Sequence, residues 1–295
     1  MNEKFTISQF LKRFPNDEAC LEELKKLRYP DGVFCSKCQL VTNHYKVTGR
    51  TAYACANCGN HIYPLAGTIL DKTTTPLRLW YYAIYLMAQT RAGISAKQLE
   101  RELGVTYKTA WRMFKQIRML MNDGGTPLTG TVEIDETFIG GKAKNRKRKW
   151  AQGVEGEHKE VVMGMLQRNG KAYLRHVKGT GKWTLLEQIK ENVSNDARVI
   201  TDEWGGYIHL PLHGYKHDYV NHKNTFVRGD IHTQNIECMW GNLKRGVTGV
   251  YRVVSKKYLQ AYADEYAFRY NNRLSKRSMF DLILARVPSV AMVKV

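Results

Sequence analysis

Two closely spaced pairs of cysteines constrain the fold of this chain more than any other feature. Cys35 and Cys38 form one Cys-x-x-Cys pair, and after sixteen intervening residues Cys55 and Cys58 form a second. Each pair fits a tight knuckle, and two knuckles present four thiolates in the tetrahedral arrangement that suits Zn²⁺. Because four protein ligands leave no open position for a substrate, we expect residues 31–63 to form a zinc ribbon around a structural ion. A segment this small scarcely folds without its metal.

The net charge of the chain indicates which kind of partner it binds. The 46 basic residues outnumber the 27 acidic ones and give a formal charge of +19, which favours polyanions. No apolar run approaches the roughly 20 residues that span a bilayer, and the first residues lack the basic-then-apolar plan of a secretory signal. The pairing of these cysteines is better explained by a reduced, intracellular site than by disulfide bonds. We therefore expect a cytoplasmic, nucleoid-associated protein that binds nucleic acid and not a membrane.

Helical patterns surround the predicted ribbon. Residues 1–30 carry apolar positions at helical spacing and are expected to form an N-terminal helical segment. Within residues 64–125, Ser95 is a candidate N-cap whose capping box Gln98 would complete, and Gly104 supplies a turn before a second helix. This layout is that of a helix-turn-helix, whose second helix lies in the major groove of DNA.

The second of these helices begins with residues suited to DNA. Tyr107, Lys108, Arg112 and Lys115 lie along its first turns, where base edges or phosphates would be met. A plain helical hairpin with a solvated basic face explains the same pattern. The net charge and the neighbouring zinc ribbon favour DNA binding.

A turn-forming linker at residues 123–130 separates the helical region from a domain of different periodicity, which we place at residues 126–295. Strand-like runs at its start are followed by a helix, a further strand and a late helix. That order is expected of a ribonuclease-H-like α/β domain. The predicted fold class is therefore multidomain, with an N-terminal zinc ribbon and helix-turn-helix followed by a ribonuclease-H-like α/β catalytic domain.

Three acids in this domain are candidate metal ligands. Asp135 lies in a strand expected to be covered on both faces, where a carboxylate is costly to bury unless a cation compensates; Glu133 and Glu136 compete with it for this role. Asp202 directly follows another strand-like run, and ligands often bind at the carboxyl ends of strands. Glu237 lies on the late helix. Two acids on strands and a third on a helix can converge to hold divalent metal ions.

The helix that carries Glu237 spans residues 232–245. One face is an apolar stripe at i, i+3, i+4 and i+7, formed by Ile236, Met239, Trp240 and Leu243. Glu237 and Lys244 lie two turns apart on another face. A solvated ion pair would explain that face equally well in an isolated helix. The two upstream acids favour a functional site.

Basic residues near these acids are candidate DNA contacts. The run at residues 142–149 contains six basic residues, among them Arg146, Lys147, Arg148 and Lys149. It can bind the phosphate backbone nonspecifically or serve as a solvated loop. Lys244 and Arg245 lie near the end of the late helix, and His232, just before that helix, is a candidate helper near the catalytic centre.

The chain resembles the transposases of bacterial insertion sequences of the IS1595 group. The resemblance rests on Val-Glu-Ile-Asp-Glu-Thr-Phe-Ile-Gly-Gly-Lys at residues 132–142, on His-Thr-Gln-Asn-Ile-Glu-Cys-Met-Trp-Gly-Asn-Leu-Lys-Arg at residues 232–245, and on Phe-Arg-Tyr-Asn-Asn-Arg at residues 268–273. The upstream ribbon and helix-turn-helix match the usual domain order of that family. Cys238 and Met239 stand where the family has glycine and an aromatic residue, which alters local packing without touching the acids.

The resemblance implies a ribonuclease-H-like core with an Asp-Asp-Glu triad and a following lysine. Asp135 and Asp202 match the two aspartates, Glu237 matches the glutamate, and Lys244 matches the lysine. Some relatives use an asparagine as the third ligand, which leaves Asn235 as a minor alternative.

We therefore expect a DNA transposase that cleaves at insertion-sequence ends and transfers the 3′-hydroxyl strand into target DNA. The three acids would bind two Mg²⁺ ions, for which Mn²⁺ could substitute, and Lys244 would hold a phosphate. The expected partners are double-stranded DNA, as terminal inverted repeats and as target, and further copies of the chain. Two other functions fit the same domains: a DNA-binding regulator with an inactive catalytic domain, and a nuclease that does not join strands.

Overall fold

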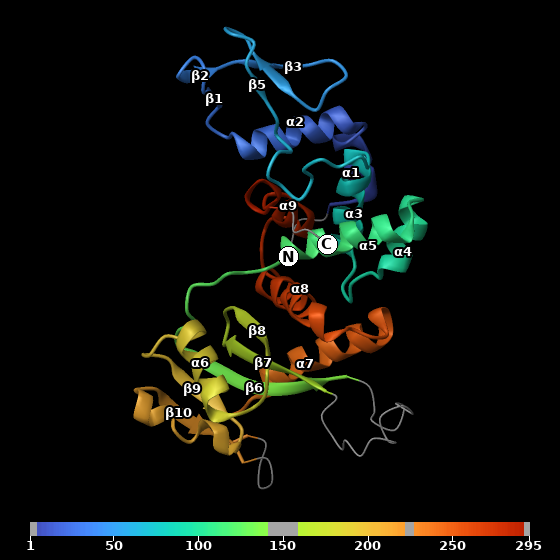
Figure 1. Cartoon of the computed structure of the whole chain (residues 1–295). Helices are drawn as coiled ribbons and strands as arrows, with labels where there is room; N and C mark the ends of the chain where they lie inside the picture. Colours follow the sequence, from blue (N-terminus) through green and yellow to red (C-terminus); the bar gives the residue numbers. More distant parts are fainter. Residues whose placement is uncertain (1–4, 141–158, 222–226, 292–295) are drawn as a thin grey trace. The chain divides into compact units, whose positions relative to one another are not determined.

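The computed structural model describes residues 5–140, 159–221 and 227–291. The chain divides into two compact units (Figure 1). One unit runs from the N-terminus to Leu120 and includes the segment from Leu274 onward, and the other runs from Met121 to Arg273. No helix in the described parts of the chain is long and apolar enough to cross a membrane.

The first unit begins with two helices and small antiparallel sheets. The helices are α1 (Ile7–Arg13) and α2 (Asp17–Arg28), and the strands are β1 (Val33–Cys35), β2 (Leu40–Thr42), β3 (His44–Lys46), β4 (Tyr53–Cys55) and β5 (His61–Ile62). Strands β1 and β2 form a pair, and β3, β4 and β5 form a three-stranded sheet in that order. The Tyr53 hydroxyl donates to Glu22 Oε2 at 2.8 Å, which ties β4 to α2.

Three further helices follow in this unit: α3 (Leu77–Gln89), α4 (Ala96–Leu103) and α5 (Tyr107–Met119). Ser95 caps α4 as predicted by accepting from the Gln98 amide. The Gln98 side chain donates to Glu102 at 2.6 Å instead. It therefore does not complete the capping box that the sequence predicts. Gly104 ends α4 with φ +63°, a left-handed conformation that glycine adopts without strain.

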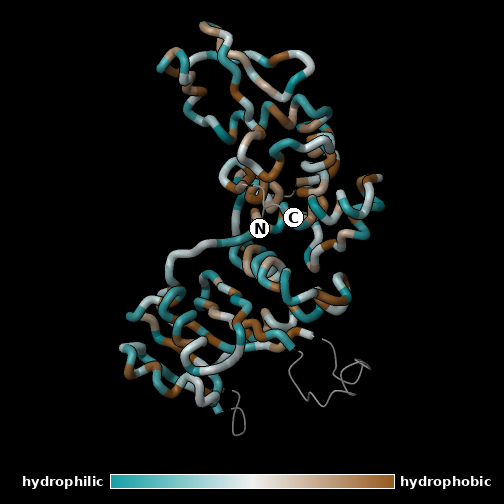
Figure 2. The backbone as a smooth tube through the Cα atoms, in the orientation of Figure 1, coloured by the Kyte–Doolittle hydropathy of each residue, from teal (hydrophilic) through white to brown (hydrophobic). Residues whose placement is uncertain are grey.

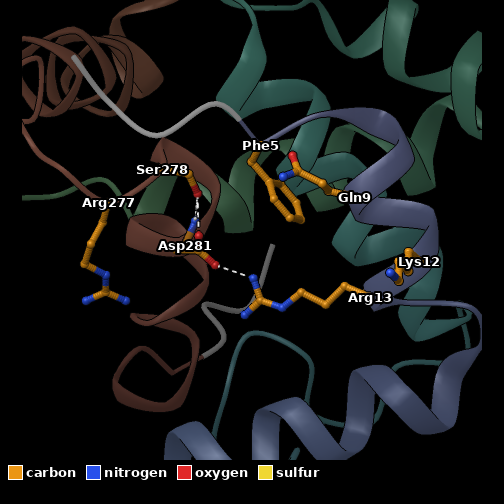
Figure 3. A pocket seen from close by; sticks show the side chains of 7 residues that line it. All are labelled: Phe5, Gln9, Lys12, Arg13, Arg277, Ser278 and Asp281. Carbon is orange, nitrogen blue, oxygen red and sulfur yellow. Dashed lines mark hydrogen bonds and ion pairs between the residues drawn. The ribbon is translucent and has the colours of Figure 1, made fainter.

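Helix α9 (Met279–Leu284) lies within residues 126–295, which the sequence analysis placed in one domain, but it packs within the first unit. Phe280 is fully buried and stacks on Phe5 with ring centroids 4.7 Å apart. Arg13 Nη1 lies 2.6 Å from Asp281 Oδ1 (Figure 3). An aromatic cluster and an ion pair therefore hold α9 against α1, beside a cavity of about 720 Å³.

The second unit is built on a five-stranded mixed sheet. Its strands are β6 (Thr131–Ile139), β7 (Glu160–Gln167), β8 (Ala172–Val177), β9 (Arg198–Thr201) and β10 (Lys216–Tyr219). The strand order is β10-β9-β6-β7-β8. Strands β6, β7 and β8 are antiparallel neighbours, whereas β9 is parallel to β6 and β10 is parallel to β9. Asn169 has φ +58° in the predicted Asn-Gly turn between β7 and β8.

Helices cover both faces of this sheet (Figure 1). Helix α6 (Lys182–Asn192) packs its apolar residues against Val132, Ile134 and their neighbours in one core. Helices α7 (Gln234–Gly246) and α8 (Leu259–Asn271) pack against Ile139 and the opposite face in a second core. Strand β7 is buried at its six inner positions, as expected of a strand covered on both faces. Figure 2 shows hydrophobic residues along the strands and helices of this unit.

Short helical turns complete the connections. They lie at Gly205–Tyr207, Leu210–His213, Val247–Tyr251, Lys256–Tyr258 and Val287–Ser289.

Candidate active site

The central strands bring two of the predicted acids together. Asp135 lies in β6, and Asp202 directly follows the last residue of β9. These strands are parallel, with Glu133 paired to Ile200. If this register continues for two more residues along both chains, Asp202 lies beside Asp135. The two aspartates therefore come from neighbouring inner strands, Asp135 from within β6 and Asp202 from the carboxyl end of β9, although 66 residues lie between them in the sequence.

Helix α7 brings the third acid over the same face. Its predicted apolar stripe is confirmed, because Ile236, Met239, Trp240 and Leu243 are all buried in the core beneath the helix. The Trp240 Nε1–H donates to Asp135 Oδ2 at 2.8 Å. One turn earlier, Glu237 Oε1 accepts from the Thr233 hydroxyl at 3.1 Å. The sequence assigned Trp240 to the apolar stripe and gave no signal for its hydrogen bond to Asp135.

The three carboxylates interact electrostatically. Burial raises the pKa of Asp135 to about 6; hydrogen bonds from Trp240 and from the Glu136 amide oppose that rise, and the charges of Asp202 and Glu237 add to it. Asp135 and Asp202 are half-buried, and Glu237 is exposed. Carboxylates that repel one another in this way are an arrangement that a cation stabilises. Among the described residues, only the four ribbon cysteines have candidate ligand atoms within 4.8 Å of one another. The carboxylate oxygens of the three acids are therefore spaced more widely than the four cysteine sulfur atoms.

The two competing glutamates of β6 lie in different surroundings. Glu133 is fully buried and accepts from the first turn of α7, with Asn235 N at 2.9 Å and Ile236 N at 3.1 Å. Glu136 accepts from the hydroxyl of Tyr207, which belongs to the core on the α6 side of the sheet. Burial, and then the charges of Asp135 and Asp202, raise the pKa of Glu136 to about 8 against the effect of the Tyr207 hydrogen bond.

The remaining predicted residues of this site lie around α7. The Asn235 side-chain amide donates to Glu133 Oε1 at 2.7 Å, and His232 Nδ1 lies 3.5 Å from the same oxygen. Lys244 and Arg245 are exposed in the last turn of the helix. The basic run that contains Arg146, Lys147, Arg148 and Lys149 lies outside the described residues.

A glycine on β7 allows α7 to approach the sheet at this point. Gly164 pairs with Asp135 in the strand register. A Cβ at Gly164 would lie 2.6 Å from Ile236 Cδ1 and 2.6 Å from Trp240 Cη2. Glycine at this position therefore allows Trp240 to reach the Asp135 carboxylate.

We expect Gly164→Ala to destabilise the protein, because the added methyl group overpacks the contact with α7. Overpacking of this kind typically costs about 1–3 kcal/mol. Urea unfolding measures the effect, and Gly179→Ala is the matched control, since a Cβ there meets nothing within 4 Å. Equal midpoints for the two variants would contradict this account of the packing.

The four ribbon cysteines form a compact ligand set in the first unit. Cys35 Sγ lies 3.5 Å from Cys58 Sγ, and Cys38 Sγ lies 3.9 Å from Cys55 Sγ. Four thiolates about 2.3 Å from a tetrahedral Zn²⁺ ion would lie roughly 3.8 Å apart, so the observed spacing fits zinc. All four thiols are free of disulfides.

A neighbouring hydroxyl favours the thiolate form of one ligand. Thr42 Oγ1 lies 3.1 Å from Cys55 Sγ, and this hydrogen bond is the largest cause that lowers the pKa of Cys55 to about 6. Burial acts in the opposite direction, and the backbone amides of Asn57 and Cys58 add to the lowering. A thiol that ionises readily suits a metal ligand.

The predicted DNA-contacting residues of α5 differ in exposure. Tyr107 is 48% exposed, and Lys108 is also exposed at the start of the helix. Arg112 is half-buried, with its guanidinium 5.6 Å from the centre of the Trp80 ring, and Lys115 is half-buried. Arg118, near the end of the same helix, is buried over the Phe114 ring. Fewer basic side chains of α5 are therefore exposed to solvent than its sequence suggests.

The cavity beside α1 contains none of the three acids. It is lined by Phe5, Gln9, Lys12, Arg13, Arg277, Ser278 and Asp281 (Figure 3). All of these residues belong to the first unit, whereas the acids belong to the second. This cavity is thus not where the candidate catalytic groups lie.

Comparison with known proteins identifies the domains. Residues 127–271 match the family model of the ISXO2-like transposase domain, and residues 15–61 match that of the transposase zinc-ribbon domain. Both models describe the IS1595 group. The chain belongs to the IS1595 transposase family. The resemblance found in the sequence motifs is confirmed.

Two further similarities accompany the family match. This transposase is 25% identical over 276 residues to an uncharacterized protein in transposable element ISH50 of Halobacterium salinarum, covering 88% of this chain and 92% of that one. A chain in the simian T-cell lymphotropic virus intasome with the PP2A regulatory subunit B56 gamma aligns over 72% of this transposase and 78% of its own length. That alignment has 14% identity and a TM-score of 0.31.

Proposed function

We propose that this transposase cleaves DNA at the ends of an insertion sequence and transfers the freed 3′-hydroxyl strand into target DNA. The observation that carries the proposal is the placement of Asp135 and Asp202 on neighbouring parallel strands beneath α7, the helix that bears Glu237 and whose Trp240 donates to Asp135. These acids come from two adjacent strands and the helix that covers them. The sheet order β10-β9-β6-β7-β8 supports a ribonuclease-H-like core, and family membership supports transposition.

Asp135, Asp202 and Glu237 would hold two Mg²⁺ ions, or Mn²⁺ in their place, which activate the attacking oxygen and stabilise the leaving oxygen. The chain's own residues keep the acids in place. The Trp240 indole fixes one oxygen of Asp135, and the Thr233 hydroxyl contacts Glu237. Phosphoryl transfer needs chiefly positioning and charge stabilisation.

Basic groups would hold the DNA. Lys244 lies two turns beyond Glu237 on α7 and would pair with a phosphate near the cut, with Arg245 beside it. In the first unit, Tyr107 and Lys108 are exposed at the start of α5, where a helix-turn-helix would meet bases or phosphates. Arg112 and Lys115 would contribute at the edge of that surface. The formal charge of +19 supports binding to double-stranded DNA, both terminal inverted repeats and target, by a dimer or a larger homo-oligomer.

A strand-transfer assay tests the proposal against its rivals. Purified protein, Mg²⁺ and short duplexes that end in the element's terminal repeats are mixed with a plasmid target. We expect joined products that depend on the divalent metal. Hydrolysed ends without joining would indicate a nuclease, and bound but uncut DNA would indicate a regulator; either result would overturn the proposal.

We expect divalent-metal binding at the three acids to weaken as the pH falls through about 6. The pKa of Asp135 is raised to about 6, so below that pH its carboxylate is protonated and a metal ion must displace the proton. From pH 7.5 to pH 5.5 the apparent affinity for Mn²⁺ should fall about fourfold for this one proton. Calorimetry in buffers of different ionisation enthalpy measures the proton release. An affinity that is constant over this range, with no proton released, would contradict the assignment.

A further inference from the structure

A buried carboxylate beside the three acids has no role in the proposed chemistry. Glu133 lies two residues before Asp135 in β6, so both side chains point to the same face of the sheet, the face covered by α7. The Glu133 side chain is fully buried. A carboxylate in such a position is costly unless hydrogen bonds and a counter-charge compensate it.

Glu133 supplies the N-terminal cap of α7. Its Oε2 accepts from the backbone amides of Asn235 at 2.9 Å and Ile236 at 3.1 Å. These amides are among the donors that a helix leaves without partners in its first turn. The helix's own N-cap residue, Thr233, makes no side-chain capping bond, and its hydroxyl donates to Glu237 instead. A carboxylate at a helix N-terminus also interacts favourably with the helix dipole.

An arginine completes this arrangement from the next strand. Arg168, which follows β7, donates from Nε to Glu133 Oε1 at 2.7 Å. Its Nη1 donates to the Asp230 carbonyl at 2.7 Å and its Nη2 to the His232 carbonyl at 2.9 Å. One guanidinium therefore neutralises Glu133 and holds the segment that leads into α7. We call Glu133, Arg168 and the first turn of α7 the α7 anchor.

The α7 anchor and Trp240 hold the helix on either side of Glu237. The anchor contacts residues 235 and 236, and Trp240 contacts Asp135. Glu237 lies between these two points on the same helix. The rotation and depth of α7 on the sheet, and hence the position of Glu237 relative to Asp135, depend on these two points of contact.

We propose that Glu133 is a positioning residue for the active site: through the α7 anchor it fixes the position of Glu237 relative to Asp135. This inference rests on the proposed function, because it assumes that the two acids act together on divalent metal ions. A loosened anchor should weaken metal activation and slow the reaction, and it should leave DNA binding unchanged, since Glu133 is buried.

The test uses the full chain with Glu133→Gln, which keeps the shape and one acceptor oxygen but removes the charge. We expect the Mn²⁺ concentration for half-maximal end cleavage to rise at least threefold and the turnover at saturating DNA to fall about tenfold. The affinity for DNA with Ca²⁺ in place of Mn²⁺ should stay within twofold. Glu160→Gln is the matched control: it removes a partly exposed carboxylate on β7 that pairs with His176 and Lys256.

A second variant keeps the test decisive if Glu133→Gln fails to fold. Asn235→Ala removes an exposed side chain and its 2.7 Å hydrogen bond to Glu133, and leaves both backbone donors in place. We expect a smaller shift of the Mn²⁺ midpoint, about twofold, in the same direction.

Two outcomes separate the two proposals. A wild-type Mn²⁺ midpoint and turnover in both folded variants, with Asp135→Asn inactive, would overturn the anchor and leave the proposed function standing. If Asp135→Asn also retained full activity, the proposed function itself would fail. A lower melting temperature with unchanged metal activation would show a purely structural role for Glu133, and would equally overturn its positioning role.

Discussion

Replacing Asp135 with asparagine is expected to abolish DNA cleavage and joining while the protein still folds and binds DNA. Asparagine keeps the shape of the side chain and an oxygen that can accept from Trp240 Nε1, which lies 2.8 Å from Asp135 Oδ2. It removes the negative charge that a pair of divalent ions requires. The rate should fall on the order of a thousandfold or more, which corresponds to about 4 kcal/mol of transition-state stabilisation.

The stability of this variant distinguishes loss of chemistry from loss of fold. Because burial raises the pKa of Asp135 to about 6, the folded protein binds a proton there more tightly than the unfolded chain does. Ionised Asp135 therefore opposes folding above that pH, and the neutral asparagine should leave the melting temperature at pH 7.5 unchanged or raised. A stable Asp135→Asn protein with wild-type yields of joined DNA would refute the assignment of the catalytic acids. Asp202→Asn and Glu237→Gln should likewise lose DNA cleavage and joining.

Replacing Cys55 with serine is expected to release zinc and unfold the ribbon. Cys55 contributes one of four sulfur atoms that lie within 4.8 Å of one another, and a hydroxyl is a poor substitute for a thiolate. Structural zinc contributes roughly 10–16 kcal/mol in small domains, which exceeds what a segment of this size gains from its own core. The selection of element ends should be lost with it.

Zinc content per chain and amide hydrogen exchange measure this effect. We expect about one equivalent of zinc in the wild-type protein, almost none in Cys55→Ser, and rapid exchange at β3 and β4 in the variant. Cys238→Ser is the control, since Cys238 is exposed on α7 and outside the four-cysteine set. A zinc-free chain whose ribbon amides remained protected would contradict the structural role of the metal.

Local sequence signals predicted the elements that carry the candidate site. The Cys-x-x-Cys pairs predicted a compact cluster because each pair lies within one turn of chain, and the four thiols do gather. The apolar stripe of α7 was confirmed, because periodic burial follows directly from helical geometry. The strands that carry Asp135 and precede Asp202 were also predicted.

Contacts between distant segments account for what the sequence left open. Strand alternation places Glu133 and Asp135 on one face, but it cannot tell which of them will cap a helix. That outcome depends on α7, about 100 positions later in the sequence. The residues of β10, Lys216–Tyr219, are polar and gave no strand signal, although an edge strand tolerates polar side chains. The contact of α9 with Phe5 joins segments at opposite ends of the sequence, and no local pattern indicates it.

Anomalous diffraction from crystals of the full chain grown with Mn²⁺ tests most directly whether Asp135, Asp202 and Glu237 form one metal site. We predict manganese peaks bound by all three carboxylates where α7 covers β6 and the carboxyl end of β9. These peaks should be lost in Asp135→Asn crystals grown in the same way. Peaks bound elsewhere, or none at these acids under conditions that support cleavage, would contradict the account.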